Sequence, residues 1–152
     1  MQILDRSAGI RPAMPESTSE PSMKPSVYRP RRRLLLVDDN AEGRRALARL
    51  LEFYDFDVTS VPDGASALQI LRQSPPPEFI LTDLLLPDID GREIARQAQK
   101  LVPKPIIVMI TGWDFGSEIP DRAESGIDHV FLKPLDMADL VSTLTKAGAR
   151  KI

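Results

Sequence analysis

The chain has 152 residues, 42% of them hydrophobic, and a formal net charge of -2, which suits one domain with an ordinary core and gives no general attraction for nucleic acid or an anionic membrane. It contains no cysteine, which excludes disulfide bonds, thiolate metal sites and cysteine nucleophiles. Because no apolar run approaches the roughly 20 residues that span a bilayer and no secretory signal is recognisable, we expect a cytoplasmic protein.

Residues 1–32 are rich in proline, serine, threonine and glutamate and show neither the period of a strand nor that of a helix. Such a segment cannot bury enough apolar surface to offset the entropy lost on ordering. We therefore interpret residues 1–32 as a disordered, proline-rich tail. The folded domain is expected over residues 33–148, followed by a short C-terminal tail over residues 149–152.

From Arg33 onward, short apolar runs alternate with helical patterns, which is typical of repeated βαβ units and a parallel sheet. The first strand is predicted through residues 34–37. Asn40 is suited to cap the next helix, whose predicted buried face carries Leu47, Leu50, Leu51 and Tyr54. After a second strand over residues 57–61, Asp63-Gly64 opens a helix that the prolines at 75–77 must terminate.

The third and fourth strands are predicted over residues 79–82 and 106–110. The helix between them carries apolar residues on one side, namely Ile94, Ala98 and Leu101. After the fourth strand, glycine and proline interrupt the pattern. Only a short helix around Ile119 and Ala123 is expected there.

A fifth strand over residues 129–132 precedes the last predicted helix. Asp136 is its N-cap, Gly148 its end, and its buried face carries Met137, Leu140, Val141 and Leu144. Right-handed crossovers place the helices of such units on both faces of a sheet. The predicted fold is therefore α/β, with a doubly wound, five-stranded parallel sheet.

Four of the predicted strands end in residues suited to phosphate chemistry. Asp38 and Asp39 follow the first strand, Asp83 the third, Thr111 the fourth and Lys133 the fifth. In an open parallel sheet, residues at the carboxyl ends of the strands converge where the strand order reverses. Three carboxylates in one cleft raise one another's pKa and favour a bound cation. Mg2+ (or Mn2+) suits such hard oxygen ligands.

This chemistry favours Asp38 and Asp39 as metal ligands, and Asp83 as a bridge to the substrate or as a nucleophile that accepts a phosphoryl group. The Lys133 ammonium and the Thr111 hydroxyl would neutralise charge on the phosphoryl oxygens. Taken singly, each residue also has an ordinary interpretation. The acid pair could form a cap and turn, the threonine could end a strand, and the lysine could be solvated.

Together these motifs resemble the receiver domain of two-component response regulators, over about residues 33–147. Val-Asp-Asp-Asn at residues 37–40 is similar to the family's acidic pair. Asp-Leu-Leu-Leu-Pro-Asp-Ile-Asp-Gly at residues 83–91 matches its phosphoacceptor loop, with proline four and glycine eight residues after the aspartate. Thr111-Gly112 matches its switch hydroxyl and small residue, and Lys133-Pro134 its lysine and proline pair.

The resemblance implies a flavodoxin-like sheet in the order 2-1-3-4-5, with Mg2+ held by Asp38, Asp39, Asp83 and the backbone carbonyl of Leu85. It also implies phosphorylation of Asp83 by a histidine kinase or histidine phosphotransfer protein. Such a chain is no conventional enzyme but catalyses its own phosphorylation and dephosphorylation. The family's Lys-Pro bond is usually cis, which is expected here for Lys133-Pro134. The surroundings of Thr111 look most like those of receivers that work with hybrid histidine kinases.

One departure concerns the switch. The family usually places tyrosine or phenylalanine three residues before the lysine, and Val130 stands there. Phe131 is no simple substitute because neighbouring strand residues face opposite sides, and His129 is expected to be a surface or packing residue for the same reason. Two bulky residues near the acceptor and the switch hydroxyl, Leu85 and Trp113, are expected to slow hydrolysis of the phosphorylated state.

The sequence therefore predicts a stand-alone receiver whose output is protein binding or phosphate relay, to an unknown downstream protein, with no nucleic-acid or membrane partner. Two alternatives stay open. A pseudo-receiver scaffold would never turn over phosphate, but its expected mark is the loss of an acid or of the lysine, and neither is missing. A Mg2+-dependent small-molecule phosphatase usually has a second acid two residues after its nucleophile and a cap segment, which this sequence lacks.

Overall fold

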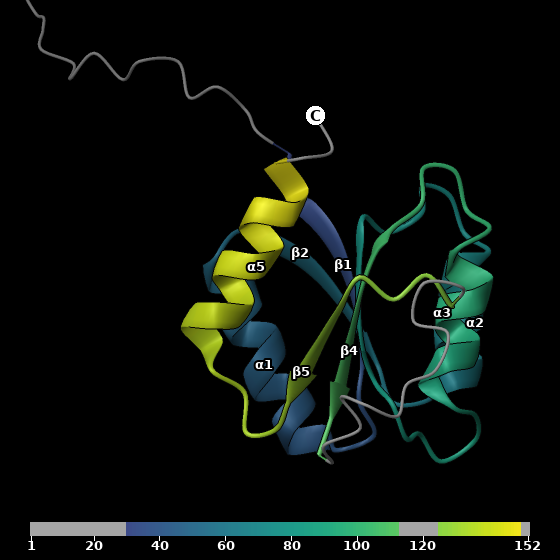
Figure 1. Ribbon diagram of the computed structural model, residues 1–152, viewed down its shortest axis with the longest axis horizontal. Coiled ribbons are helices and arrows are strands. Elements are labelled where there is room, and N and C mark those ends of the chain that lie inside the picture. Colours follow the sequence, from purple (N-terminus) through teal and green to yellow (C-terminus); the bar gives the residue numbers. More distant parts are fainter. Residues whose placement is uncertain (1–29, 113–124, 150–152) are drawn as a thin grey trace, which may run out of the picture. The chain divides into compact units, whose positions relative to one another are not determined.

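The computed structural model describes residues 30–112 and 125–149 (Figure 1). The described residues from Arg31 onward belong to one structural unit. Four sequence-based predictions lie outside the described residues: the tail before residue 30, the short helix around Ile119 and Ala123, the position of Trp113, and the C-terminal tail after residue 149.

Five parallel strands form one sheet in the order β2-β1-β3-β4-β5, as predicted. The strands are β1 (Arg32–Val37), β2 (Phe56–Val61), β3 (Phe79–Asp83), β4 (Ile106–Thr111) and β5 (His129–Leu132). The order reverses between β1 and β3, which are direct neighbours with Val37 opposite Thr82. The residues that follow these two positions therefore emerge side by side at the carboxyl edge of the sheet.

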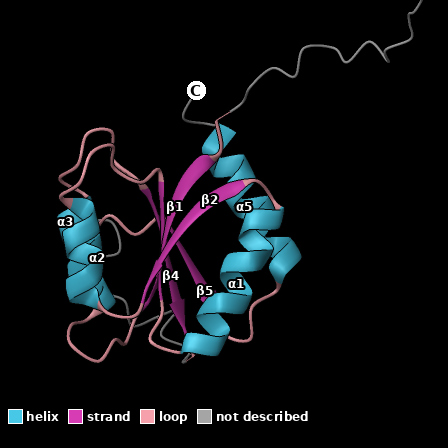
Figure 2. Cartoon of the chain, turned by 180° about the vertical axis from the view of Figure 1, so that it is seen from behind, coloured by secondary structure: helices cyan, strands magenta, loops and turns pink. Residues whose placement is uncertain are grey.

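Helices cover both faces of the sheet (Figures 1 and 2). On one face lie α1 (Ala41–Phe53) and α5 (Met137–Ala149), and on the other α2 (Gly64–Leu71) and α3 (Gly91–Ala98). Side chains alternate along β1, so that Leu34 and Leu36 join the α1/α5 core whereas Leu35 and Val37 join the α2/α3 core. Two apolar cores thus hold the strand ends in register.

The predicted helix caps are confirmed. Asn40 accepts a hydrogen bond from the Gly43 amide at 2.7 Å, and Asp63 accepts one from Ser66 at 2.8 Å. Asp136 caps α5 in the same way through the Asp139 amide, at 3.1 Å. These side chains satisfy amides that have no partner within their own helix, which fixes where each helix begins.

Some details of the helices differ from the sequence-based expectation. In α1 the buried residues are Leu47, Ala48 and Leu51, whereas Leu50 and Tyr54 are 44% and 46% exposed. The buried stripe is centred on Leu47 and Leu51, and Tyr54 lies in the C-cap rather than in the helix. Likewise Leu101 lies beyond the end of α3 and is only half-buried.

Gly148 lies inside α5 and does not terminate it, because the helix continues to Ala149. A Cβ atom at Gly148 would lie 2.6 Å from Arg32 Nη1 and 3.0 Å from the Phe79 ring. The Arg32 guanidinium also stacks over that ring, 5.2 Å from its centroid. The glycine is therefore needed for close packing of α5 against the first residue of β1. That strand begins at Arg32, two residues before its predicted start.

Gly91 allows α3 to begin directly against the end of β3. A Cβ atom there would lie 2.2 Å from the Asp83 carbonyl oxygen and 3.1 Å from Met109 Sδ. Because the first of these atoms belongs to the backbone, it cannot move aside cheaply. We expect Gly91→Ala to lower the free energy of unfolding by about 2–3 kcal/mol.

Urea unfolding of the parent and of Gly91→Ala measures the expected loss of stability. The matched control is Gly112→Ala, since no atom of the described residues lies within 4 Å of a Cβ at Gly112. The control is expected to stay within about 0.5 kcal/mol of the parent. Equal effects of the two substitutions would contradict the steric explanation.

Candidate functional site

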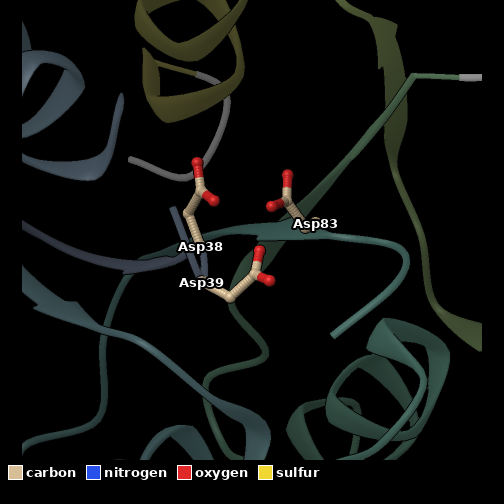
Figure 3. Close-up of side chains that lie close together, drawn as sticks. All are labelled: Asp38, Asp39 and Asp83. Carbon is tan, nitrogen blue, oxygen red and sulfur yellow. The ribbon is translucent and has the colours of Figure 1, made fainter. Parts of the chain in front are cut away.

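Three carboxylates gather where β1 and β3 end (Figure 3). Asp38 and Asp39 follow β1, and Asp83 is the last residue of β3. Each offers one oxygen, and these oxygens lie within 4.8 Å of one another. Asp38 and Asp83 are buried, whereas Asp39 is exposed. Among the described residues this is the one group of three such side chains close enough to hold a metal ion.

The backbone around Asp38 is held by several hydrogen bonds. Its amide donates to the Val61 carbonyl at 3.2 Å, and its carboxylate accepts from the Asn40 amide at 2.9 Å. The Arg44 guanidinium donates to the Asp38 carbonyl oxygen at 2.6 Å. Strand, cap and helix α1 together therefore fix the position of the acidic pair.

The loop between β3 and α3 is held at both ends. The Leu84 amide donates to Ile110 at 2.8 Å, and the Gly91 amide donates to Leu84 at 2.7 Å. In the middle of the loop, the Asp88 carboxylate accepts hydrogen bonds from the Gly64 and Ala65 amides of α2, at 2.9 and 2.8 Å. These two bonds lower the pKa of Asp88 below its usual value. The loop that follows Asp83 is thus tied to α2.

Lys133 approaches the same site from the other side. Its Nζ lies 3.1 Å from Asp83 Oδ1, and its amide donates to the Thr111 carbonyl at 2.9 Å, which joins the ends of β4 and β5. The Lys133-Pro134 peptide is cis. A pocket of about 170 Å³ opens between these elements, lined by Asp39, Asp83, Leu84, Leu85, Ile110, Thr111, Gly112 and Lys133.

Burial dominates the electrostatics of Asp83. Burial and the neighbouring Asp38, through a hydrogen bond and its charge, raise the pKa of Asp83 to about 7, although Lys133 opposes the rise. Burial acts to lower the pKa of Lys133, yet its hydrogen bond to Asp83 and the nearby carboxylates raise it overall. With one ammonium facing three carboxylates, the site favours a further cation.

The residues predicted from the sequence lie mainly around one pocket. The acids, Thr111 and Lys133 line or adjoin one pocket, and the exposed Leu85 side chain lies at its edge. On β5, Val130 packs with the α2/α3 core and Phe131 with the α1/α5 core. Phe131 therefore faces away from Val130's side of the sheet. His129 is half-buried.

Sequence reasoning missed Arg44 and Asp88, which hold the two loops of the site. Asn40 in the cap position indicates the start of α1, but nothing in the sequence shows that Arg44 turns back to the carbonyl of Asp38, six residues earlier. The contact of Asp88 with Gly64 joins residues 24 positions apart. No local pattern marks such a pair, so only the three-dimensional structure could show it.

Comparison with known proteins identifies the class to which this fold and site belong. The family model described as "Response regulator receiver domain" matches residues 34–145. Response regulator receiver protein CpdR of Brucella abortus (strain 2308) is 36% identical over 115 residues, covering 76% of this chain and 95% of the relative. The chain therefore belongs to the response regulator receiver domain family.

Other relatives agree with this assignment. Response regulator MprA of Mycobacterium sp. (strain KMS) is 30% identical over 112 residues, which are 74% of this chain and 48% of MprA. The chain thus spans about half the length of the MprA relatives. A CheY-like receiver domain from Methanospirillum hungatei JF-1 has a TM-score of 0.70 and 26% identity, covering 77% of this chain and 93% of that structure.

A receiver domain from Clostridium thermocellum, with a TM-score of 0.72 and 22% identity, covers 79% of this chain and 96% of that structure and shows the shared fold alone. No helix among the described residues has the length and apolar character to cross a bilayer.

Proposed function

We propose that this receiver domain accepts a phosphoryl group on Asp83, in a Mg2+-dependent reaction, from a histidine kinase or a histidine phosphotransfer protein. The observation that carries the proposal is the position of the Asp83 carboxylate, with two further acids on one side and the Lys133 ammonium 3.1 Å away on the other. A carboxylate oxygen of Asp83 would attack phosphorus, the P–N bond to the donor imidazole would break, and its electron pair would return to the ring nitrogen.

The donor set fits magnesium. Asp38, Asp39 and Asp83 offer hard carboxylate oxygens from two adjacent strand ends, and the exposed Leu85 segment at the edge of the pocket can add its backbone carbonyl. Mg2+ is typically held by one or two carboxylates together with phosphate oxygens and water, and Mn2+ accepts the same ligands. When bound, the ion neutralises negative charge on the phosphoryl oxygens.

The residues of the chain supply the remaining stabilisation. The Lys133 ammonium already contacts Asp83, and Thr111 lines the same pocket. Both groups can bind phosphoryl oxygens, where negative charge is spread in the transition state. Transfer of this kind depends on positioning and charge neutralisation more than on acid-base chemistry.

The output that we propose is a change in protein binding. Thr111 and Lys133 would turn toward the phosphoryl group, and Val130, which lies on β5 opposite Met109 and already packs against the α2/α3 core, would adjust its packing there. Valine has a smaller side chain than tyrosine or phenylalanine, so its movement displaces less volume. We therefore propose that Thr111 and the ends of β4 and β5 carry the switch.

Intact mass measurement after incubation with Mg2+ and acetyl phosphate tests the proposal. The parent chain is expected to gain one phosphoryl group, whereas Asp83→Ala or an excess of EDTA is expected to prevent the gain. An unmodified parent chain under conditions that modify another receiver would support the pseudo-receiver alternative. Steady hydrolysis of small phosphate esters would support the phosphatase alternative.

Replacing Lys133 with methionine removes the ammonium but keeps a long apolar side chain. We expect phosphoryl transfer to slow by about 100-fold, while Mg2+ affinity stays the same or rises because a positive charge has left the site. Transfer rates from acetyl phosphate and calorimetric Mg2+ titrations separate the two effects. Lys146→Met, which alters an exposed lysine on α5, is expected to change neither quantity. Equal transfer rates for Lys133→Met and the parent would contradict this role.

A further inference from the structure

A second cavity lies between the carboxyl-terminal parts of α2 and α3, which stand side by side on one face of the sheet (Figures 1 and 2). It has a volume of about 350 Å³ and is lined by Leu68, Leu71, Arg72, Gln97, Lys100 and Leu101. We name it the α2/α3 groove. It shares no lining residue with the pocket around Asp83. The groove and that pocket are therefore separate sites.

The apolar part of the groove comes from three leucines. Leu71 is buried, whereas Leu68 and Leu101 are half-buried, so the latter two keep apolar surface in contact with water. Val102, which follows Leu101 in the chain, is 91% exposed. The volume lies at the low end of the range for ligand cavities and suits one or two large apolar side chains. Leu68 and Leu101 also pack against the α2/α3 core, so the floor of the groove is apolar and fixed in place, and only part of it is open to a ligand.

The charged part of the groove is positive. Arg72 and Lys100 are exposed, and in the described part of the chain neither forms an ion pair. Glu93, seven residues before Lys100, is already bonded to Gln97 at 3.0 Å and to Arg96 at 2.7 Å, and the Lys100 charge adds to their lowering of its pKa. Cations at helix carboxyl termini are favourable in themselves. That effect does not account for their position beside the half-buried Leu68 and Leu101.

We propose that the α2/α3 groove docks a segment of a partner protein in which an apolar side chain is flanked by carboxylates. The apolar side chain would lie on Leu68 and Leu101, and the carboxylates would pair with Arg72 and Lys100. A second copy of this chain fits poorly, because a two-fold interface would place the same two cations against each other. Nucleic acid would leave the leucines uncovered, and the whole chain carries a net charge of -2.

The inference does not depend on phosphoryl transfer, and its test can be carried out without Mg2+ or a phosphodonor. The probe is a short synthetic peptide with a central pair of leucines flanked by glutamates, titrated into the isotopically labelled full chain and followed by NMR. Shift changes are expected at the backbone amides of the groove, which belong to Leu68, Leu71, Arg72, Lys100 and Leu101. A control peptide with serine in place of the leucines is expected to bind about tenfold more weakly or worse.

A second test reverses the charge of the two cations that line the groove. The double variant Arg72→Glu/Lys100→Glu is expected to weaken peptide binding at least about tenfold. The matched control Arg45→Glu/Arg49→Glu alters two exposed arginines on α1, on the opposite face of the sheet, and is expected to keep the parent affinity. Both double variants change the net charge of the chain by the same amount.

Three results would overturn the proposal. The first is the absence of shift changes in the groove at millimolar peptide. The second is equal weakening by both double variants, which would indicate attraction to the whole chain rather than to the groove. The third is equal binding of the serine control peptide or of a single-stranded oligonucleotide, which would show that the leucines contribute nothing.

Discussion

Replacing Asp83 with asparagine is expected to stabilise the metal-free protein by on the order of 1–3 kcal/mol. Asp83 is only 6% exposed, and burial next to Asp38 raises its pKa to about 7. Its ionised form is therefore costly in the folded state, and asparagine removes that cost while keeping the shape. Sites that bind a cation commonly sacrifice stability in this way.

The pH dependence of this effect has a definite sign. The pKa of Asp83 is about 7 in the folded state against an ordinary aspartate pKa of 3.8, so between these values the folded state binds more protons than the unfolded state. The stability contributed by this carboxyl is therefore full below about pH 4, falls as the pH rises to about 7 and stays low above that. The Asp83→Asn protein does not lose stability in this way. Its free energy of unfolding should therefore exceed that of the parent by a growing amount as the pH rises across the same range.

Urea unfolding in EDTA at a series of pH values measures the difference between the two proteins. Asp57→Asn, which alters an exposed acid on the edge strand β2, serves as the control and is expected to follow the parent. Mg2+ should narrow or reverse the difference, because it stabilises the folded parent by binding. An Asp83→Asn protein less stable than the parent above pH 7 without metal would contradict the account.

Replacing Asp39 with asparagine is expected to weaken Mg2+ binding by about 10- to 100-fold. Asp39 is the exposed member of the cluster, and its carboxylate lies within 4.8 Å of the other two ligand oxygens. The substitution removes one negative charge from the donor set but leaves the buried acids and Lys133 in place. Phosphoryl transfer should fall in parallel at low Mg2+ and recover in part when Mg2+ is raised.

Calorimetric Mg2+ titration of the apo protein provides the readout independently of phosphoryl transfer. Glu42→Gln is the matched control, since Glu42 is an exposed acid in the first turn of α1 and is not part of the cluster. It removes the same charge and is expected to change Mg2+ affinity less than about twofold. Equal losses in the two variants would indicate a general charge effect and would count against a site at Asp39.

Much of the fold could be predicted because the signals are local. Apolar runs ended by a polar residue define the strands, and Asn40, Asp63 and Asp136 define helix starts. The convergence of Asp38 with Asp83 follows from the adjacency of parallel strands at the point where their order reverses. Each of these inferences needs only residue type and position along the chain.

The remaining features depend on contacts between distant segments. The helical period predicted Leu50 and Tyr54 on the buried face together with Leu47 and Leu51, but only Leu47 and Leu51 of these four are buried. Gly148 was predicted to end the last helix, but it lies inside the helix, where it allows close packing beside Arg32 and Phe79. Such outcomes depend on which element lies opposite, and a one-dimensional pattern does not contain that information.

Locating the phosphoryl group on the chain tests the central claim most directly. The full chain would be treated with Mg2+ and acetyl phosphate and then with borohydride, which reduces an aspartyl phosphate to homoserine, before peptide mass spectrometry. Homoserine is expected at residue 83 alone, and only when Mg2+ is present. Reduction at Asp38 or Asp39, modification of His129, or labelling that is equally efficient in EDTA would contradict the account.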